Sequence, residues 1–113
     1  MHDAAMFEKD LVAATSRTFV LSILTEGDSY GYEIIQRVAE LTDGALIWTD
    51  GMLYPVLHRL EDGGCVRSYW QPSPTGRKRK YYALTDVGRD ELDDRKRQWR
   101  VANDALLALW PDA

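Results

Sequence analysis

One β-hairpin signal constrains the fold of this chain most, because nearly every other regular pattern in it is helical. Residues 65–70 and 80–84 are rich in strand-forming side chains, and they flank a connection that contains two prolines and a glycine. The chain has 113 residues, a length that suits one compact domain. The sequence therefore predicts a mainly α fold with a small β-hairpin, of the α+β class.

Periodic apolar residues predict three helices before the hairpin. The first is expected to have about five turns, and its apolar positions recur at spacings of four and three: Phe7, Leu11, Ala14, Thr18 and Leu21. The second covers residues 30–38 and is expected to bury Ile34, Ile35, Val38 and Leu41. An apolar link at residues 45–48, expected as a single extended strand, leads to the third helix, which should bury Leu53, Val56, Leu57 and Leu60.

A fourth and longer helix is predicted after the hairpin. Thr85 is placed to cap it, and Asp86 lies near the positive end of the helix dipole. The helix should run for roughly 25 residues and carry an apolar seam that repeats about every seven residues. The seam, a predicted dimer interface, consists of Leu92, Trp99, Ala102, Leu106 and Leu109.

The order of these elements indicates a winged helix-turn-helix over residues 1–85, followed by a dimerisation helix over residues 86–113, built as one compact unit. In this fold the third helix enters the major groove of DNA, while the hairpin, or wing, reaches the adjacent backbone or minor groove. The outward side of the third helix is then free to face DNA with Thr49, Asp50, Gly51, Met52, Tyr54, His58 and Arg59.

The charge distribution agrees with a nucleic-acid partner, although the net charge of the chain is −4. Residues 66–82 contain no acidic side chain and carry a basic run of Arg77, Lys78, Arg79 and Lys80. Because salt screens charges beyond about 8–10 Å, a local positive field attracts a polyanion even when the whole molecule is negative. Double-stranded DNA is therefore the predicted partner.

Three linked motifs carry a family resemblance. Residues 31–34 (Gly-Tyr-Glu-Ile), 51–61 and 76–85 with the following Gly88 occur in this order. Together they resemble the PadR family of bacterial transcriptional regulators, in the subgroup with a single C-terminal helix. The resemblance implies a homodimeric repressor that binds an inverted-repeat operator through its wings and third helices. Tyr30, at a position where the family often has histidine, joins the predicted DNA interface. Tyr81 and Tyr82 alternate along a strand, so one should point inward and one outward, and Tyr82 is taken as the contact.

The same resemblance implies an effector site in the last helix. Trp99 matches the position at which multidrug-sensing members present a tryptophan from each subunit, so that a small planar aromatic ligand stacks between the two rings and releases the repressor. By position, the same cavity is lined by Phe7, Leu11, Ala14, Thr18, Ser22 and Asn103. Asn103 is uncharged, which leaves the charge preference of the site open. Dimer packing alone is the other interpretation of Trp99.

Several classes of function find no support in the sequence. It contains no glycine-rich phosphate loop, no Gly-x-Ser-x-Gly elbow and no plausible His-centred triad, so catalysis is not predicted. One cysteine and two histidines without ligand spacing predict no metal and no cofactor. Cys65 is expected to be buried, with redox sensing as the weaker alternative. No segment approaches the roughly 18 apolar residues of a membrane span, and a soluble, cytoplasmic protein is expected.

Other interpretations of the predicted DNA contacts remain open. Tyr54 could hold the third helix in place from the edge of the core, and His58 and Arg59 could form the hydrated side of that helix. Likewise, the basic run could be a solvated loop. A winged helix that binds a protein and no DNA is the main alternative function. Neutralising the basic run separates the two functions, because operator binding requires those charges.

Overall fold

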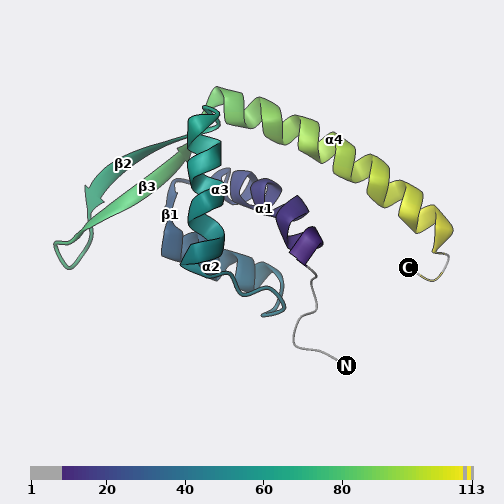
Figure 1. The fold of residues 1–113 in the computed structure, drawn as a ribbon, viewed down its shortest axis with the longest axis horizontal. Coiled ribbons are helices and arrows are strands. Elements are labelled where there is room, and N and C mark those ends of the chain that lie inside the picture. Colours follow the sequence, from purple (N-terminus) through teal and green to yellow (C-terminus); the bar gives the residue numbers. More distant parts are fainter. Residues whose placement is uncertain (1–8, 111, 113) are drawn as a thin grey trace.

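The computed structural model describes residues 9–110 and residue 112, and the chain forms a helical head with a projecting wing and a long C-terminal arm (Figure 1). The elements follow in the order α1 (Lys9–Leu24), β1 (Ser29–Tyr30), α2 (Gly31–Leu41), α3 (Asp50–Asp62), β2 (Val66–Pro72), β3 (Lys78–Leu84) and α4 (Asp86–Leu109). The strands form one antiparallel sheet in the order β1-β3-β2. The predicted fold class is therefore confirmed.

The core of the head lies between α1, α2, α3 and the base of the sheet. The four apolar positions predicted for α3 are all buried: Leu53, Val56, Leu57 and Leu60. They pack with buried side chains of the other elements, including Val20, Leu21, Ile34, Val38 and Trp48. Pro55 lies inside α3 but points away from the core. The core thus fixes which side of α3 faces outward.

The apolar link and one strand differ from the sequence prediction. Residues 45–48 form an irregular loop, in which Leu46 and Trp48 are buried and Ile47 is exposed. The ring of Trp48 meets that of Phe19 edge to face, with centroids 5.9 Å apart. The third strand is instead β1, whose two residues pair with the inner end of β3. The link is apolar because it covers the core, and not because it joins a sheet.

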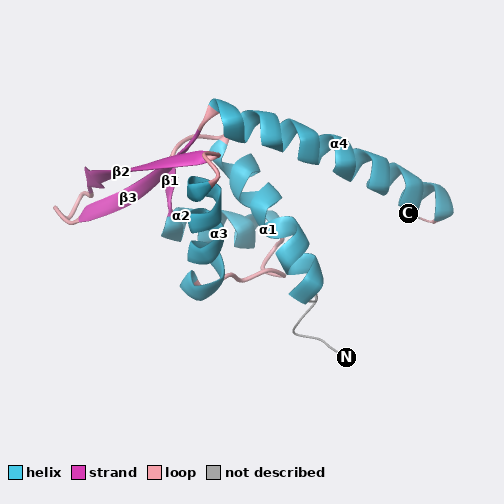
Figure 2. Ribbon diagram, turned by 45° about the horizontal axis from the view of Figure 1, so that its top comes forward, coloured by secondary structure: helices cyan, strands magenta, loops and turns pink. Residues whose placement is uncertain are grey.

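The ends of α1 and α2 are less buried than their apolar patterns indicate. Leu41, predicted to lie in the core, is 50% exposed because it is the last residue of α2 and lies one turn beyond the buried Val38. On α1, Leu11 and Ala14 are exposed, and burial is concentrated in the C-terminal half of the helix. Phe7 lies outside the described residues. Figures 1 and 2 show α4 extending past α1 as a separate arm.

The start of α4 is locked to the head through Thr85. As predicted, its hydroxyl caps α4 by accepting a hydrogen bond from the Gly88 amide at 3.0 Å. The same hydroxyl donates to the Gly64 carbonyl at 2.6 Å, and the Thr85 amide donates to the Cys65 carbonyl at 3.1 Å. Leu92, predicted to lie in a dimer interface, is only 2% exposed and belongs to the core of its own protomer. The first two turns of α4 are therefore part of the head.

An ion-pair cluster joins α4 to α1. The Glu91 carboxylate accepts hydrogen bonds from Arg17 at 2.7 Å and from Arg95 at 3.1 Å. The Arg17 guanidinium, together with that of Arg95, holds the pKa of Glu91 below its usual value. Burial raises the pKa of the neighbouring Cys65 thiol, and the Glu91 charge adds to the effect. Cys65 is thus buried as predicted, and its environment favours the less reactive thiol form.

Replacing Glu91 by glutamine should lower the free energy of unfolding by about 1–2 kcal/mol at neutral pH, because both arginines lose a charged acceptor. The folded-state pKa of Glu91 lies below its unfolded-state value, so the wild-type contribution is complete above the unfolded-state pKa and disappears as pH falls through the folded-state pKa. Urea unfolding near neutral pH and in acid measures this difference. The two proteins should converge in acid, and a constant gap would contradict the prediction.

No helix in the described part of the chain combines the length and the apolar character that crossing a membrane requires.

Candidate nucleic-acid interface

The outward side of α3 carries the residues that the sequence assigns to DNA. They are all exposed: Thr49, Asp50, Gly51, Met52, Tyr54, His58 and Arg59. In Figure 1, α3 lies in front of α1 and α2. Thr49 precedes the helix but makes no side-chain cap. The hydroxyl of Thr49 is therefore available to another partner.

Tyr54 packs at the edge of the core, which is one of the two roles that the sequence left open, and it stays partly exposed. Its side chain is 36% exposed, yet its hydroxyl lies against Gly31 at the start of α2. A Cβ atom at residue 31 would lie 2.6 Å from the Tyr54 hydroxyl oxygen and 3.1 Å from the adjoining ring carbon. Glycine at position 31 and tyrosine at position 54, which belong to two separate sequence motifs, are thus one packing unit that joins α2 to α3.

Replacing Gly31 by alanine should lower the free energy of unfolding by about 1–3 kcal/mol, since the added methyl group displaces the Tyr54 ring. In a Tyr54→Ala background the same change should be neutral or slightly stabilising, because alanine is the better helix former. A double-mutant cycle by urea unfolding measures this coupling. Equal effects of Gly31→Ala in both backgrounds would contradict the contact.

The wing consists of β2, β3 and the turn between them, and it projects away from the helices (Figure 2). Its tip is closed by a hydrogen bond from the Ser73 amide to the Arg77 carbonyl at 2.6 Å. The basic run begins at this tip with Arg77 and continues along β3 through Lys80, so three of its four cations belong to the strand. Arg77 and Lys78 are exposed, and Arg79 and Lys80 are half-buried.

Tyr82 is a correction to the predicted interface. It is 1% exposed, because it lies on the inner face of the central strand β3, opposite Ser68 and beside Ser29. Burial raises the pKa of its phenol. The neighbouring Tyr81 points to the other face, where it is half-buried and stacks on Tyr69 with centroids 5.8 Å apart. Strand alternation predicted one tyrosine in and one out, but the choice of Tyr82 for DNA was wrong.

Tyr30 lies on the same face as Tyr81 and is half-buried there. The two rings meet edge to face with centroids 5.4 Å apart. The Arg79 guanidinium lies 4.4 Å from the centroid of the Tyr30 ring. Tyr69 completes the cluster by donating a hydrogen bond to the Asp28 carboxylate at 2.7 Å. Tyr30 and Arg79, both predicted DNA contacts, therefore also have partners within the protein.

Four of the predicted effector residues, Ala14, Thr18, Ser22 and Trp99, line two cavities that both include Trp99. One, of about 470 Å³, is lined by Thr15, Thr18, Phe19, Ser22, Ile23, Glu26, Leu41 and Trp99. The other, of about 350 Å³, is lined by Ala14, Arg95, Gln98, Trp99 and Ala102. The predicted Leu11 and Asn103 are exposed on α1 and α4. Phe19 and Ile23 were missed because the effector residues were taken by position from the family resemblance.

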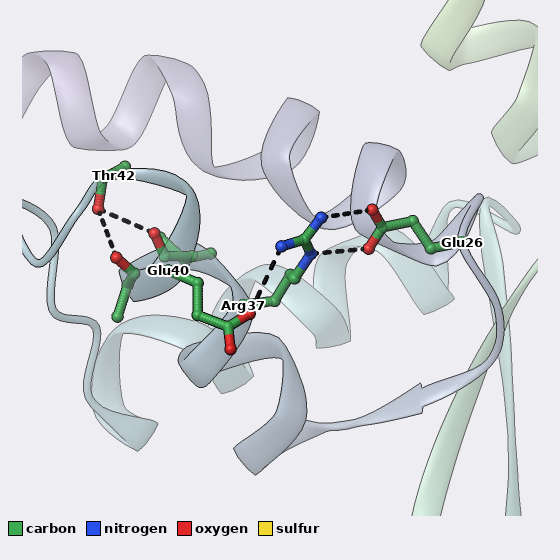
Figure 3. A network of polar contacts seen from close by, with 6 residues as sticks. Glu26, Arg37, Glu40 and Thr42 are labelled. Atoms are coloured by element: carbon green, nitrogen blue, oxygen red, sulfur yellow. Dashed lines mark hydrogen bonds and ion pairs between the residues drawn. The ribbon is translucent and has the colours of Figure 1, made fainter.

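Glu26 at the edge of the larger cavity is an acidic residue that the sequence did not indicate. Figure 3 shows its carboxylate facing Arg37 of α2, whose guanidinium donates to it at 2.8 and 2.9 Å. Arg37 also contacts Glu40 at 3.4 Å. The hydrogen bond from Arg37 lowers the pKa of Glu26, so this carboxylate is ionised and paired at neutral pH. The network joins the end of α1 to α2 beside the cavity.

The distal half of α4 makes an exposed apolar arm. Every residue from 96 to 110 is exposed, and this arm includes five large apolar side chains besides Trp99: Val101, Leu106, Leu107, Leu109 and Trp110. The predicted interface residues Trp99, Ala102, Leu106 and Leu109 are all in this exposed part. Such a long apolar surface on an isolated helix is typical of a protein interface.

Three helices, a sheet with a projecting two-stranded wing, and a long C-terminal helix make this chain a winged-helix protein. The model of the PadR-like family of transcriptional regulators matches residues 20–94, and the chain belongs to that family. The resemblance found in the sequence motifs is thus confirmed. The chain is accordingly a transcriptional regulator of the PadR type.

Individual relatives agree with this assignment. A structure of a transcriptional regulator from Clostridium thermocellum has a TM-score of 0.80 at 31% identity, covering 89% of this chain and 95% of that one. A PadR-like transcriptional regulator from Bacillus cereus has a TM-score of 0.81 at 25% identity, covering 93% and 100%. The transcriptional regulator YqjI of Escherichia coli is 29% identical over 92 residues, which are 81% of this chain but only 42% of YqjI.

Proposed function

We propose that this chain is a sequence-specific DNA-binding repressor that acts in the cytoplasm as a homodimer on an inverted-repeat operator. The observation that carries the proposal is the combination of an exposed polar side of α3 with a cationic wing. A recognition helix supplies contacts to base edges in the major groove, and the wing supplies phosphate contacts beside it. The local cations outweigh the net charge of −4, because screening limits each charge to its own surroundings.

The exposed arm of α4 supports the homodimer. Its apolar side chains have no cover within the described protomer, and a second copy would bury them against the matching arm and the exposed part of α1. In this arrangement residues 1–85 form the DNA-binding head and residues 86–113 the dimerisation helix. The paired arms set the distance between two recognition helices, which must be about 34 Å to reach successive major grooves.

The cavities beside Trp99 support an effector site at the same interface. A volume of about 470 Å³ is within the range that holds a small organic molecule. A planar aromatic or hydrophobic effector would stack on Trp99 and favour a different spacing of the heads. The resulting loss of DNA affinity is limited by how differently the effector binds the two spacings.

Fluorescence anisotropy of a labelled duplex from the DNA immediately upstream of the coding region tests the DNA-binding proposal. A scrambled duplex is the control, and both are measured at two salt concentrations. The native duplex should bind at least tenfold more tightly, with an affinity that falls steeply as salt rises. Equal, weak binding of both duplexes, together with capture of a protein partner, would instead favour the interaction module.

Trp99→Ala tests the effector part of the proposal independently. Aromatic compounds that release the wild-type protein from its duplex should lose this effect in the variant, provided that its mass in solution is still that of a dimer. An unchanged response of the Trp99→Ala dimer would exclude the site beside Trp99.

A further inference from the structure

The wing has two faces of different character, and its strand register assigns residues to each. Side chains directly opposite each other on paired strands share a face. Trp70 pairs with Lys80, and Pro72 pairs with Lys78. These four residues, Trp70, Pro72, Lys78 and Lys80, are here named the front face of the wing. The basic run is therefore split, because alternate residues of β3 point to opposite sides of the sheet.

The front face continues the side of the sheet on which α3 packs. Ser68 lies two residues before Trp70 on β2, and its hydroxyl donates to the Glu61 carboxylate of α3 at 2.5 Å. Lys80 lies two residues before the buried Tyr82, and its ammonium is 5.7 Å from the centroid of that ring. The wing extends this side of the sheet beyond α3 (Figure 1). The front face and the outward side of α3 thus belong to one continuous side of the molecule.

The opposite face is occupied by contacts within the protein. Tyr69 and Tyr81 stack there, and Arg79 lies over Tyr30. A cation held against an aromatic ring in this way stabilises the base of the wing. Arg79 is therefore held against a ring on this opposite face, and more closely than Lys80, whose ammonium lies 5.7 Å from the Tyr82 centroid on the front face, although the two residues are adjacent in the sequence.

The high exposure of Trp70 on the front face is not explained by the fold. Its side chain is 63% exposed, although a tryptophan is the largest apolar side chain and is usually well buried. Its cross-strand neighbour is a lysine, and a second lysine follows on the same face toward the tip. An exposed aromatic ring between cations matches a nucleic-acid backbone, in which apolar deoxyribose surfaces alternate with phosphates.

We infer that the front face of the wing is a DNA-binding surface, in which Trp70 packs on deoxyribose at the edge of the minor groove and Lys78 and Lys80 contact the flanking phosphates. Arg79 stabilises the wing from the opposite face. This inference rests on the proposed function, and it adds to it a contact residue, Trp70, that the motifs did not indicate. It also divides the cations of the basic run into two groups. Only the cations that do not lie on the face of the wing that carries Tyr30 contribute to ionic binding of DNA phosphates.

The salt dependence of DNA binding separates these roles. Each lost phosphate contact reduces the slope of log affinity against log salt by about 0.9, hence about 1.8 for one lysine in each half of a dimer. Lys80→Gln should show this reduction, whereas the matched variant Arg79→Gln should keep the wild-type slope. Trp70→Ala should weaken binding about tenfold or more without changing the slope, because the contact is not ionic. Trp70→Phe should recover most of the affinity.

Anisotropy with the upstream duplex measures these slopes, and Trp70→Phe serves as the conservative control at the same position. Trp70 is exposed, so Trp70→Ala should keep the thermal midpoint of the wild type. Binding of Trp70→Ala within twofold of the wild type would overturn this inference and leave the proposed function intact. A wild-type protein that binds no duplex would overturn the proposed function, and this inference with it.

Discussion

Replacing Gly88 by alanine should destabilise this protein more than any other single substitution of a glycine in the described chain. A Cβ atom at residue 88 would collide with the carbonyl oxygen of Cys65 and approach the Leu84 side chain to 2.8 Å. The carbonyl belongs to the backbone and accepts the Thr85 amide, so it cannot move without breaking the junction between β2 and α4. We expect a loss of about 3–5 kcal/mol in the free energy of unfolding.

Urea unfolding followed by circular dichroism measures this loss, and Gly51→Ala is the matched control. Gly51 also lies in the first turn of a helix, but the nearest atom to its added Cβ would be the Thr49 hydroxyl oxygen at 3.8 Å. That variant should be as stable as the wild type or up to about 1 kcal/mol more stable. Equal free energies of unfolding for Gly88→Ala and Gly51→Ala would contradict this prediction, because they would show that α4 can move away from the Cys65 carbonyl without loss of stability.

Local rules predicted the parts of this fold that local interactions determine. The spacing of Leu53, Val56 and Leu57 placed the buried side of α3, because a helix repeats every 3.6 residues whatever its surroundings. Thr85 was predicted as the cap of α4 from residue type alone, since a threonine hydroxyl there satisfies a free amide of the first turn. The outward side of α3 then followed by exclusion.

The errors arose where one continuous apolar pattern spans two segments that have different surroundings. Leu92 continues the seven-residue repeat of Trp99 and Leu106, but it is buried in the head, because α4 crosses α1 before it projects as an arm. A heptad pattern does not indicate where the first partner ends and the next begins. The strand β1 has only two residues, Ser29 and Tyr30, and exists because β3 lies beside it, so no local signal marks it.

The candidate interface was predictable in composition but not in arrangement. The sequence indicated four cations in a wing, yet the division between Lys80 and Arg79 depends on register and on the position of Tyr30. The exposed Trp70 was not predicted as a contact, since β-forming residues in a strand are equally consistent with burial. The choice between Tyr81 and Tyr82 likewise required knowing which face of β3 meets the core.

Neutralising the whole basic run should abolish specific DNA binding. A protein with Arg77, Lys78, Arg79 and Lys80 all replaced by glutamine loses at least three cations on each wing that are able to reach phosphates, or about six in a dimer. The slope of log affinity against log salt should fall by about 5, and affinity for the upstream duplex should fall by about a thousandfold or more at low salt. None of the four forms a salt bridge within the described residues. The fold should therefore persist despite the loss of the Arg79 contact with Tyr30, and circular dichroism checks this.

A charge-matched variant separates the local field of the wing from the overall charge. Replacing Arg89, Lys96, Arg97 and Arg100 of α4 by glutamine changes the net charge by the same amount, from −4 to −8, but leaves the wing intact. Provided that its mass remains that of a dimer, this variant should keep most of the affinity and the wild-type salt slope, because none of these four cations belongs to the wing. If both variants weaken binding equally, net charge and not the wing governs the association. If neither does, the winged helix serves a protein partner.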